Sequence, residues 1–470
     1  MIWIIESTPN HCNKGSEYLS KVINSDERIQ KLSRECLERG NIDKELYAKY
    51  NVNIGLRDLN GKGVLTGLTD VSEIRQNKTV DGKTVPTDGK LFYRGINVED
   101  IIHGCIKDNR LGFEEVVYLL LFSKLPTKQE LDGFMELLSD IRVLPKHFVR
   151  DVILKASGKD MMTSLAKAVL TLASYDNDVM NLEMDNVLRQ CLKLISLFPL
   201  LTVYSYQAYN HYSKGESLFI HNPERCEPTA EILLRTLRED RKFTALEAQV
   251  LDMALILHAE HGGGNNSTFT TCVVTSSGTD TYSAIAAALC SLKGPKHGGA
   301  NLRVMGMMNE IKYNVKDWTD DEEIGAYLQK ILNKDAYDRS GLIYGIGHAV
   351  YSISDPRARV FKGSVEKLAQ AKGEMEEYGL YSRIERLAPQ IIAQNRRMYK
   401  GVSANVDFYS GFVYKMLGLP QELYTPIFAV ARIAGWSAHR MEELMNVKKI
   451  IRPAYMSVCK ETPYTDINDR

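Results

Sequence analysis

The 470-residue sequence lacks the features that mark several large classes of protein. Its 59 basic and 59 acidic residues balance, so no excess of positive charge favours a nucleic acid or an anionic membrane as partner. No uninterrupted apolar run approaches the ~18 residues that a membrane-spanning helix needs. The amino terminus carries Glu6 and no leading basic region, which does not match a signal or transit peptide. We therefore expect neither nucleic acid nor membrane as a partner.

The eight cysteines are scattered along the chain without a CxxC pair, so a disulfide framework or a zinc knuckle is not indicated. His258 and His261 stand three residues apart, but the HExxH spacing is absent and no set of cysteine or carboxylate ligands accompanies them. We expect reduced thiols, a cytoplasmic location and no metal site. A structural metal ion at the two histidines is the weaker alternative.

Alternating strand patterns are scarce, and helix signals dominate. Residues 65–68 and 91–96 predict one small ribbon, whereas residues 268–275 are β-branched and ambiguous between strand and helix. Apolar periodicity predicts a helix over residues 113–122 that stops at Leu125-Pro126. Two further helices are indicated by their caps: one that opens at the capping box Thr244-Ala-Leu-Glu247 and runs to His261, and residues 282–292 behind Asp280. The sequence therefore predicts a mostly helical enzyme.

The length of the chain predicts two domains, because 470 residues are too many for one simple core. Hydrophobic content of 44% and charged content of 25% are ordinary for a globular protein. The first ~55 residues are charged and mostly compatible with helix, and we expect them to be peripheral. Internal repeats and low-complexity tracts are absent.

Histidines are few, and four of the 10 stand beside glycine or at breaks between helical runs. Such breaks let a side chain point into a cavity instead of a packed interface. Neutral imidazoles, one carboxylate and isolated arginines are the groups needed to move a carbon-bound proton and to hold an anionic acceptor. We therefore expect a catalytic site built from four segments: His258-Ala-Glu-His261-Gly-Gly-Gly-Asn265, Gly294-Pro-Lys-His297-Gly-Gly-Ala-Asn301, Gly345-Ile-Gly347-His348-Ala-Val350 through Asp355-Pro-Arg357, and Ala404-Asn-Val-Asp407.

Each of these residues also has a purely structural interpretation, which local sequence leaves open. Asp407 stands before a helical run and is a plausible helix N-cap. His297 is equally a loop histidine bonded to nearby backbone, and His261 a carboxy-terminal helix cap.

The arginines leave similar alternatives. Arg432 is the only charge in eleven residues and must be paired if it is buried, either with an internal acid or with a bound carboxylate. Arg357 follows the turn signal Asp355-Pro356 and is otherwise an ordinary exposed loop residue. Arg452 is otherwise part of an exposed basic tail.

In this order and at these separations, the four segments resemble those of the citrate synthase family. The similarity extends to Gly89-Lys-Leu-Phe-Tyr-Arg-Gly-Ile96, Leu119-Leu-Leu-Phe-Ser-Lys-Leu-Pro126 and Ala431-Arg-Ile-Ala-Gly-Trp436, and covers roughly residues 60 to 460. The resemblance implies an all-α, two-domain fold, with a large helical domain (56–298 and 415–470) and a smaller mobile helical domain (299–414). The N-terminal helical region, 1–55, would remain outside both. It also implies a homodimer with shared active sites that condenses acetyl-CoA with oxaloacetate.

The resemblance also implies roles for the catalytic residues. Asp407 would remove a methyl proton from acetyl-CoA, and His297, near a helix amino terminus, would stay neutral and hydrogen-bond the enolate oxygen. His348 would polarise the oxaloacetate ketone and protonate the developing alkoxide.

The remaining site residues would hold the two substrates, with no permanently bound cofactor and acetyl-CoA or CoA as co-substrate. Guanidinium groups match carboxylates bidentately, so the arginines would clamp oxaloacetate, with Arg452 reaching across the dimer. Residues assigned to oxaloacetate are His261, Asn265, Arg357, Arg432 and Arg452. Those assigned to CoA are Gly345, Gly347, Ala349 and Asn405.

Two departures from the family pattern matter. The family often has Glu directly after the oxaloacetate-binding histidine, where this chain has Gly262. The N-terminal region does not resemble the β-rich extension of hexameric, NADH-inhibited bacterial enzymes. Two other functions stay open: 2-methylcitrate synthase, which uses propionyl-CoA and shares these motifs, and a non-catalytic CoA-binding protein of the same fold.

Overall fold

A computed structural model of the chain describes residues 27–58, 63–80, 83–347, 351, 353–395, 402–447 and 449–470. Two predicted site residues, His348 and Ala349, lie outside the described residues. The chain divides into two compact units, Met1–Leu68 and Thr69–Arg470. All of the predicted site residues belong to the second unit.

The first unit contains little buried surface. Residues 27–39 are helical, and they are followed by the short helix α2 (Lys44–Lys49) and the 3₁₀ turn η1 (Ile54–Leu56). The Asp43 side chain caps α2 by accepting a hydrogen bond from the Glu45 backbone N–H at 2.9 Å. Neither α2 nor η1 has a buried residue, so these elements add nothing to a hydrophobic core of their own chain.

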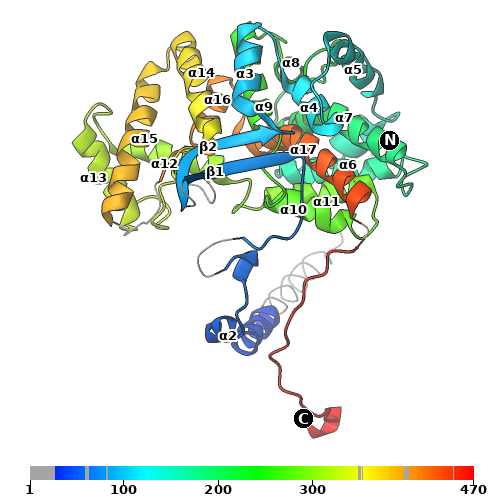
Figure 1. The fold of residues 1–470 in the computed structure, drawn as a ribbon, viewed down its shortest axis with the longest axis vertical. Coiled ribbons are helices and arrows are strands. Elements are labelled where there is room, and N and C mark those ends of the chain that lie inside the picture. Colours follow the sequence, from blue (N-terminus) through cyan, green and yellow to red (C-terminus); the bar gives the residue numbers. More distant parts are fainter. Residues whose placement is uncertain are drawn as a thin grey trace, which may run out of the picture. The chain divides into compact units, whose positions relative to one another are not determined.

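The second unit is mainly helical, which confirms the predicted fold class (Figure 1). Its helices in the first half are α3 (Val98–Lys107), α4 (Phe113–Phe122), α5 (Lys128–Ile141), the π-helical turn η2 (Val149–Leu154), α6 (Met161–Ala173), α7 (Met184–Lys214), α8 (Thr229–Leu237) and α9 (Ala245–His258). Those in the second half are α10 (Asn266–Thr275), α11 (Thr281–Lys293), α12 (Ala300–Asn314), α13 (Asp321–Leu332), α14 (Pro356–Lys372), α15 (Met375–Asn395), α16 (Val406–Met416), η3 (Gln421–Leu423), α17 (Tyr424–Asn446) and η4 (Ile467–Asp469).

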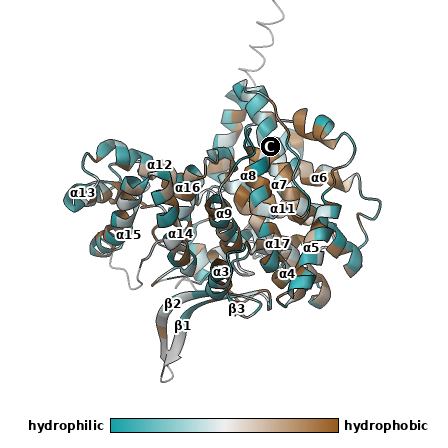
Figure 2. Ribbon diagram, turned by 90° about the horizontal axis from the view of Figure 1, so that it is seen from above, coloured by the Kyte–Doolittle hydropathy of each residue, from teal (hydrophilic) through white to brown (hydrophobic). Residues whose placement is uncertain are grey.

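Within this unit the helices form two groups. Figure 2 shows α12, α13, α15 and α16 together on one side, and α4 to α8, α11 and α17 on the other, with α9 between the groups. Helix α14 packs against α15 and α16 and also against α9, so it joins the two groups. The first group covers nearly the same residues as the predicted small domain, 299–414. The division into a large and a mobile small domain remains a prediction.

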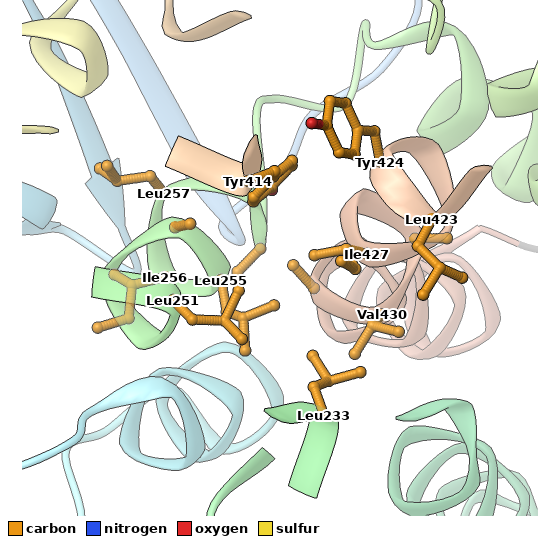
Figure 3. Close-up of a cluster of buried hydrophobic side chains, with 14 of the residues drawn as sticks. Leu233, Leu251, Leu255, Ile256, Leu257, Tyr414, Leu423, Tyr424, Ile427 and Val430 are labelled. Atoms are coloured by element: carbon orange, nitrogen blue, oxygen red, sulfur yellow. The ribbon is translucent and has the colours of Figure 1, made fainter. Parts of the chain in front are cut away.

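The core centres on α9 and α17, which lie against each other (Figure 3). Leu251 and Leu255 of α9 face Ile427 and Val430 of α17, and Leu233 of α8 closes the cluster. Nearly every residue of α9 is buried, as expected of a helix surrounded by others. Because these two helices are fixed on all sides, side chains at the end of α9 and along α17 have well-defined positions.

Helix α7 is the one helix in the described part of the chain that is long and apolar enough to cross a membrane. Most of its apolar stretch is buried against other helices, and a core helix of a soluble protein passes the same test. Its contacts with α6, α8 and α17 identify it as a core helix here.

The strands form one antiparallel sheet of order β1-β2-β3, with β1 (Ser72–Val80), β2 (Lys83–Tyr93) and β3 (Ile96–Asn97). Ser72 pairs with Tyr93 and Ile74 with Leu91. The predicted ribbon is therefore half right: residues 91–96 supply β2 and β3, but residues 65–68 form no strand. Leu65 and Leu68 are 85% and 93% exposed, and no partner surface holds them in a sheet.

The helix predictions were accurate at amino termini and less so at carboxy termini. Helix α4 matches the predicted span, although it ends at Ser123 in a left-handed conformation, before the proline. Both halves of the Thr244–Glu247 capping box are present, but α9 ends three residues before His261. Asp280 caps α11 by accepting from the Ser283 N–H at 2.9 Å.

The ambiguous β-branched segment is helical and lies in α10. Its Thr271 hydroxyl donates to the carbonyl four residues earlier at 3.0 Å, which satisfies a polar group that is fully buried. Tertiary packing against α11 and α17 therefore outweighs the strand propensity of these residues.

Candidate active site

The end of α9 and the middle of α17 meet at a buried arginine. Arg432 is 1% exposed, and its Nε–H donates to the carbonyl oxygen of His258, the last residue of α9, at 2.7 Å. Its Nη1 has no hydrogen-bond partner among the described residues. Burial lowers the pKa of Arg432 to about 10, so the guanidinium stays charged at neutral pH. A buried cation with an unused donor is suited to a bound carboxylate.

The ring of His258 lies beside this arginine. It is fully buried and stacks on Phe428 with ring centroids 4.2 Å apart, and neither ring nitrogen has a partner among the described residues. Burial, with the charges of Arg357 and Arg432, lowers its pKa well below the ordinary value. His258 is therefore a neutral ring inside the cluster.

A second arginine is buried at the amino terminus of α14. Asp355 is the N-cap and accepts from the Arg357 backbone N–H at 3.0 Å. The same carboxylate accepts hydrogen bonds from Nε and Nη2 of Arg357 at 3.0 and 2.8 Å. It also accepts from the Val406 N–H at 3.3 Å. Arg357 is 3% exposed, so the alternative of an exposed loop arginine is wrong. Because Val406 is the first residue of α16, the Asp355 carboxylate joins the amino termini of α14 and α16.

The hydrogen bonds of His297 fix the position of its proton. Its Nε2 accepts from the Ser267 backbone N–H at 3.3 Å and lies 3.0 Å from the Ser267 hydroxyl. A ring nitrogen that accepts from a backbone N–H carries no proton, so the neutral ring is protonated at Nδ1. Burial, and next the charge of Arg432, lower the pKa of His297 to about 4. Burial therefore favours the neutral ring that the sequence predicts.

Asn265 supports His297 through the same serine. The Ser267 hydroxyl lies 2.9 Å from Asn265 Oδ1 and accepts from Trp436 Nε1–H at 3.1 Å. Asn265 is also the N-cap residue of α10. The structure therefore places Asn265 near His297 as part of the support for its ring.

Asp407 lies in the first turn of α16 but is not its cap. The N-cap is Asn405, whose Oδ1 accepts from the Asp407 N–H at 3.0 Å, so the alternative of an N-cap aspartate is wrong. Burial raises the pKa of Asp407 to about 6, against the opposing charges of Arg357 and Arg432. It is thus a carboxylate at neutral pH with a greater proton affinity than an ordinary aspartate.

Residues 345–347 pair with residues 403–405. Gly347 N–H donates to the Ser403 carbonyl at 2.7 Å, and Asn405 donates to Gly345 and Gly347 carbonyls at 2.9 and 2.8 Å. Gly345 has φ +79° and Gly347 φ +104°, conformations that favour glycine. This pairing brings three of the four residues predicted to contact CoA together beside Asp407.

His261 and Arg357 are linked by an aromatic ring. The Tyr351 ring meets the His261 ring edge-on at 5.7 Å between centroids and lies 6.0 Å from the Arg357 guanidinium carbon. The β1–β2 hairpin approaches this ring so closely that a side chain at Gly89 would clash with Tyr351. The next glycine after His261, Gly262, has φ +84°, and the Cβ of any other residue there would lie 2.9 Å from Ile74 Cδ1.

The structure thus brings together most of the predicted site residues that it describes. His261, His297, Arg357, Arg432 and Asp407 lie in one buried cluster. Arg452 stands apart from it, exposed in the extended segment that begins where Ile451 N–H donates to Ser276 Oγ at 3.0 Å. Within the described residues, no group of three or more His, Cys, Asp or Glu side chains is arranged to hold a metal ion.

Sequence reasoning missed four residues that support this cluster. Asp355 had a signal, because an aspartate directly before Pro marks a helix start, but it was treated only as part of a turn. Ser267, Tyr351 and Trp436 gave no local signal, since each acts through a partner from a distant segment.

Comparison with known proteins assigns this site to a family. The family model described as citrate synthase, C-terminal domain, matches residues 58–454. The citrate synthase of Haloferax volcanii is 34% identical over 390 residues, which cover 81% of this chain and 93% of the relative. A 2-methylcitrate synthase of Corynebacterium glutamicum is 31% identical over 379 residues, covering 80% and 90%.

The solved structures to which this chain is similar are also citrate synthases. Citrate synthase from Thermoplasma acidophilum, solved as a ternary complex with carboxymethyl coenzyme A and oxaloacetate, superposes with a TM-score of 0.71 at 28% identity. The match covers 87% of this chain and 97% of that chain. This chain belongs to the citrate synthase family.

Proposed function

We propose that this chain is a citrate synthase, an acyltransferase that condenses acetyl-CoA with oxaloacetate and water to give citrate and CoA. The observation that carries the proposal is that a neutral, Nδ1-protonated His297 and a carboxylate, Asp407, whose pKa is raised to about 6, both lie near the buried Arg432. A hydrogen-bond donor and a strengthened base in one buried cluster are the two groups that enolisation of a thioester needs.

The reaction follows from these charge states. Asp407 takes a proton from the acetyl methyl group, and His297 Nδ1–H stabilises the enolate oxygen. The methylene carbon then attacks the ketone carbon of oxaloacetate, and the ketone oxygen takes a proton. By the family resemblance that proton comes from His348. Water then hydrolyses the thioester of citryl-CoA, which releases citrate and CoA.

Oxaloacetate is a dianion, and the cluster has the cations to hold it. Arg432 has a buried Nη1 that has no hydrogen-bond partner among the described residues. Arg357 is the second cation, and the charges of both arginines act to lower the pKa of Asp407. We assign His261 to the same substrate because Tyr351 holds its ring beside Arg357. The Gly345–Gly347 segment and Asn405 are assigned to CoA.

We further propose a homodimer with shared sites. Arg452 is exposed at the start of an extended segment that also exposes Tyr455 at 95% and Tyr464 at 80%. A cation needed for a third contact with oxaloacetate would then come from the partner subunit. Ile450, Met456 and Ile467 of the same segment are also exposed, and a run of exposed apolar side chains favours a surface that another chain covers.

One experiment separates the three candidate activities. Release of the CoA thiol is measured with oxaloacetate and either acetyl-CoA or propionyl-CoA, and kcat/KM is compared. We expect acetyl-CoA to be preferred by about 10-fold or more, the effect of one methylene in a fitted pocket. Preference for propionyl-CoA would make the chain a 2-methylcitrate synthase, an activity that a relative carries. Binding of both thioesters without thiol release would indicate a CoA-binding protein.

A further inference from the structure

Behind Arg432 lies a row of four charged side chains, which we call the buried charge row: Arg432, Glu260, His439 and Glu442. Arg432 and His439 are seven residues apart on α17 and therefore lie on the same face of the helix. Gly435 lies between them on that face. A side chain at Gly435 would clash with Glu260 Oε2 and the Ala259 carbonyl, so this glycine lets Glu260 reach between the two cations.

Glu260 is a fully buried carboxylate next to His261 in the chain. Its Oε1 accepts from Ser72 Oγ at 3.2 Å and from His439 Nε2 at 3.1 Å, whereas Oε2 has no hydrogen-bond partner among the described residues. Burial alone would raise its pKa, but His439 and Arg432 bring it below the ordinary value. Glu260 is therefore charged, and one of its oxygens is unused.

The geometry around His439 favours an imidazolium. Its Nε2 faces Glu260 at 3.1 Å and its Nδ1 faces Glu442 at 3.5 Å, and the residue is 2% exposed. A neutral imidazole has one N–H, so it cannot donate to both carboxylates. Against the effect of burial, the two glutamates raise the pKa of His439 to about 9.

Other titratable groups near the row leave its order of charges unchanged. Burial raises the pKa of Tyr93, so its hydroxyl is neutral. Arg357 and Asp407 act on Arg432 less strongly than Glu260 does, and burial with the charge of Glu442 raises the pKa of Glu443. Cys272 of α10 lies near the glutamates, and burial raises the pKa of its thiol to about 12, so it is neutral. Glu442 also accepts from the Asp70 backbone N–H at 2.7 Å, which holds it in place. Charges along the row therefore alternate: Arg432 positive, Glu260 negative, His439 positive and Glu442 negative.

We propose that His439 is a positioning residue for oxaloacetate: its positive charge engages Glu260 and so leaves the Arg432 guanidinium available to a substrate carboxylate. This rests on the proposed function, because it takes Arg432 as an oxaloacetate ligand. Among carboxylates, Glu260 acts most strongly on Arg432. Without a cation at position 439, Arg432 is the remaining cation among the described residues that lowers the pKa of Glu260. The charge of Glu260 then competes with the substrate carboxylate for the Arg432 guanidinium.

The test is a double-mutant cycle on oxaloacetate binding. His439→Gln keeps a hydrogen-bond donor near Glu260 but removes the charge, and we expect the Kd for oxaloacetate to rise about 10-fold or more. The double variant Glu260→Gln/His439→Gln removes the competing carboxylate as well, and its Kd should return to within about 3-fold of wild type. His103→Gln, at an exposed histidine of α3, is the matched control and should change nothing.

Two further measurements separate positioning from folding. The kcat of His439→Gln at saturating oxaloacetate should stay within about 3-fold of wild type, because the row does not touch the reacting atoms. In wild type, the Kd should be constant near neutral pH and begin to rise near pH 9, as His439 loses its proton. In His439→Gln the rise should begin only near pH 10, where Arg432 itself loses its proton. Because the two onsets differ, the wild-type profile tests the proposal even if the variant is unstable.

Calorimetric titration with oxaloacetate alone keeps the outcomes distinct. If the wild-type protein binds oxaloacetate but releases no CoA thiol, the proposed function is refuted. The double-mutant cycle on oxaloacetate binding still tests the role of His439 in that case. An unchanged Kd in His439→Gln, a double variant as weak as the single one, or a flat wild-type profile to pH 10 would each overturn the role of His439.

Discussion

Burial sets the charge of each residue that the proposed reaction uses. It moves His297 towards the neutral form and Asp407 towards the protonated form, while both arginines remain cations. The donor is therefore neutral when it faces the enolate, and the base binds a proton more tightly than an exposed aspartate would. A single environment adjusts both groups in the directions that proton transfer from carbon requires.

Replacing the base tests this arrangement at one atom. Asp407→Asn preserves the shape of the side chain but removes the proton acceptor, so kcat should fall by about 10² or more. Oxaloacetate affinity should change little, because Asp407 faces the other substrate. Steady-state thiol release measures the first effect and calorimetry the second. Turnover near that of wild type would remove Asp407 from the mechanism.

The pH profile follows from the same residue. Asp407 acts as a base only when deprotonated, and its pKa is about 6. We expect kcat/KM for acetyl-CoA to be level near neutral pH and to fall about 10-fold per unit at pH values well below 6. An ordinary aspartate would place this decline near pH 4. A profile that stays level down to pH 5 would show that burial does not raise the pKa of the base.

At the scale of elements, the pairing of residues 345–347 with residues 403–405 positions the start of α16. Asn405 ends this pairing and caps the helix, so one residue fixes both the backbone that we assign to CoA and the first turn that carries Asp407. Gly345 is essential to the packing because the Cβ of any other residue would lie 2.9 Å from Phe408 and Val304 side-chain atoms.

A pair of glycine substitutions tests this element. Gly345→Ala adds a methyl group where φ is +79° and where no room exists, and we expect about 2–5 kcal/mol loss in the free energy of unfolding. The matched control is Gly363→Ala, in the exposed interior of α14 with open space around it, which should stabilise by about 0.5–1 kcal/mol. Urea denaturation gives both values. Equal effects of the two substitutions would contradict the packing at Gly345.

Local signals predicted the elements well and the contacts between them poorly. The Thr244–Glu247 capping box and the Asp280 cap depend on residues within one turn, so the sequence predicts them directly. The bond from Trp436 to Ser267 joins residues 169 positions apart, and no local pattern encodes it. The family resemblance identified the residues of the cluster, but not that Asp355 neutralises Arg357 or that burial sets the state of His297.

At the scale of the whole molecule, the exposed position of Arg452 bears on assembly. If the partner subunit supplies this cation, a single chain lacks part of its oxaloacetate site. The prediction concerns chemistry and not only stability, because the cluster that contains Asp407 would be complete only in a dimer.

Mixed dimers provide the test. Arg452→Ala and Asp407→Asn should each be inactive alone, yet a mixed dimer has one site that contains neither change. After equal mixing and subunit exchange, half of the dimers are mixed, so activity should recover to about a quarter of wild type. Mass spectrometry verifies the exchange. No recovery in verified mixed dimers would mean that Arg452 serves its own subunit or no site.

Gly262 limits which residues this loop can carry. The family often has glutamate here, but in this chain the backbone has φ +84°, and an added Cβ would lie 2.9 Å from the end of the Ile74 side chain. Any other residue at position 262 would therefore strain the backbone, and Ile74 of the β1–β2 hairpin would have to move to make room for it. Positions 262 and 74 should be epistatic: the cost of Gly262→Glu depends on which residue stands at position 74.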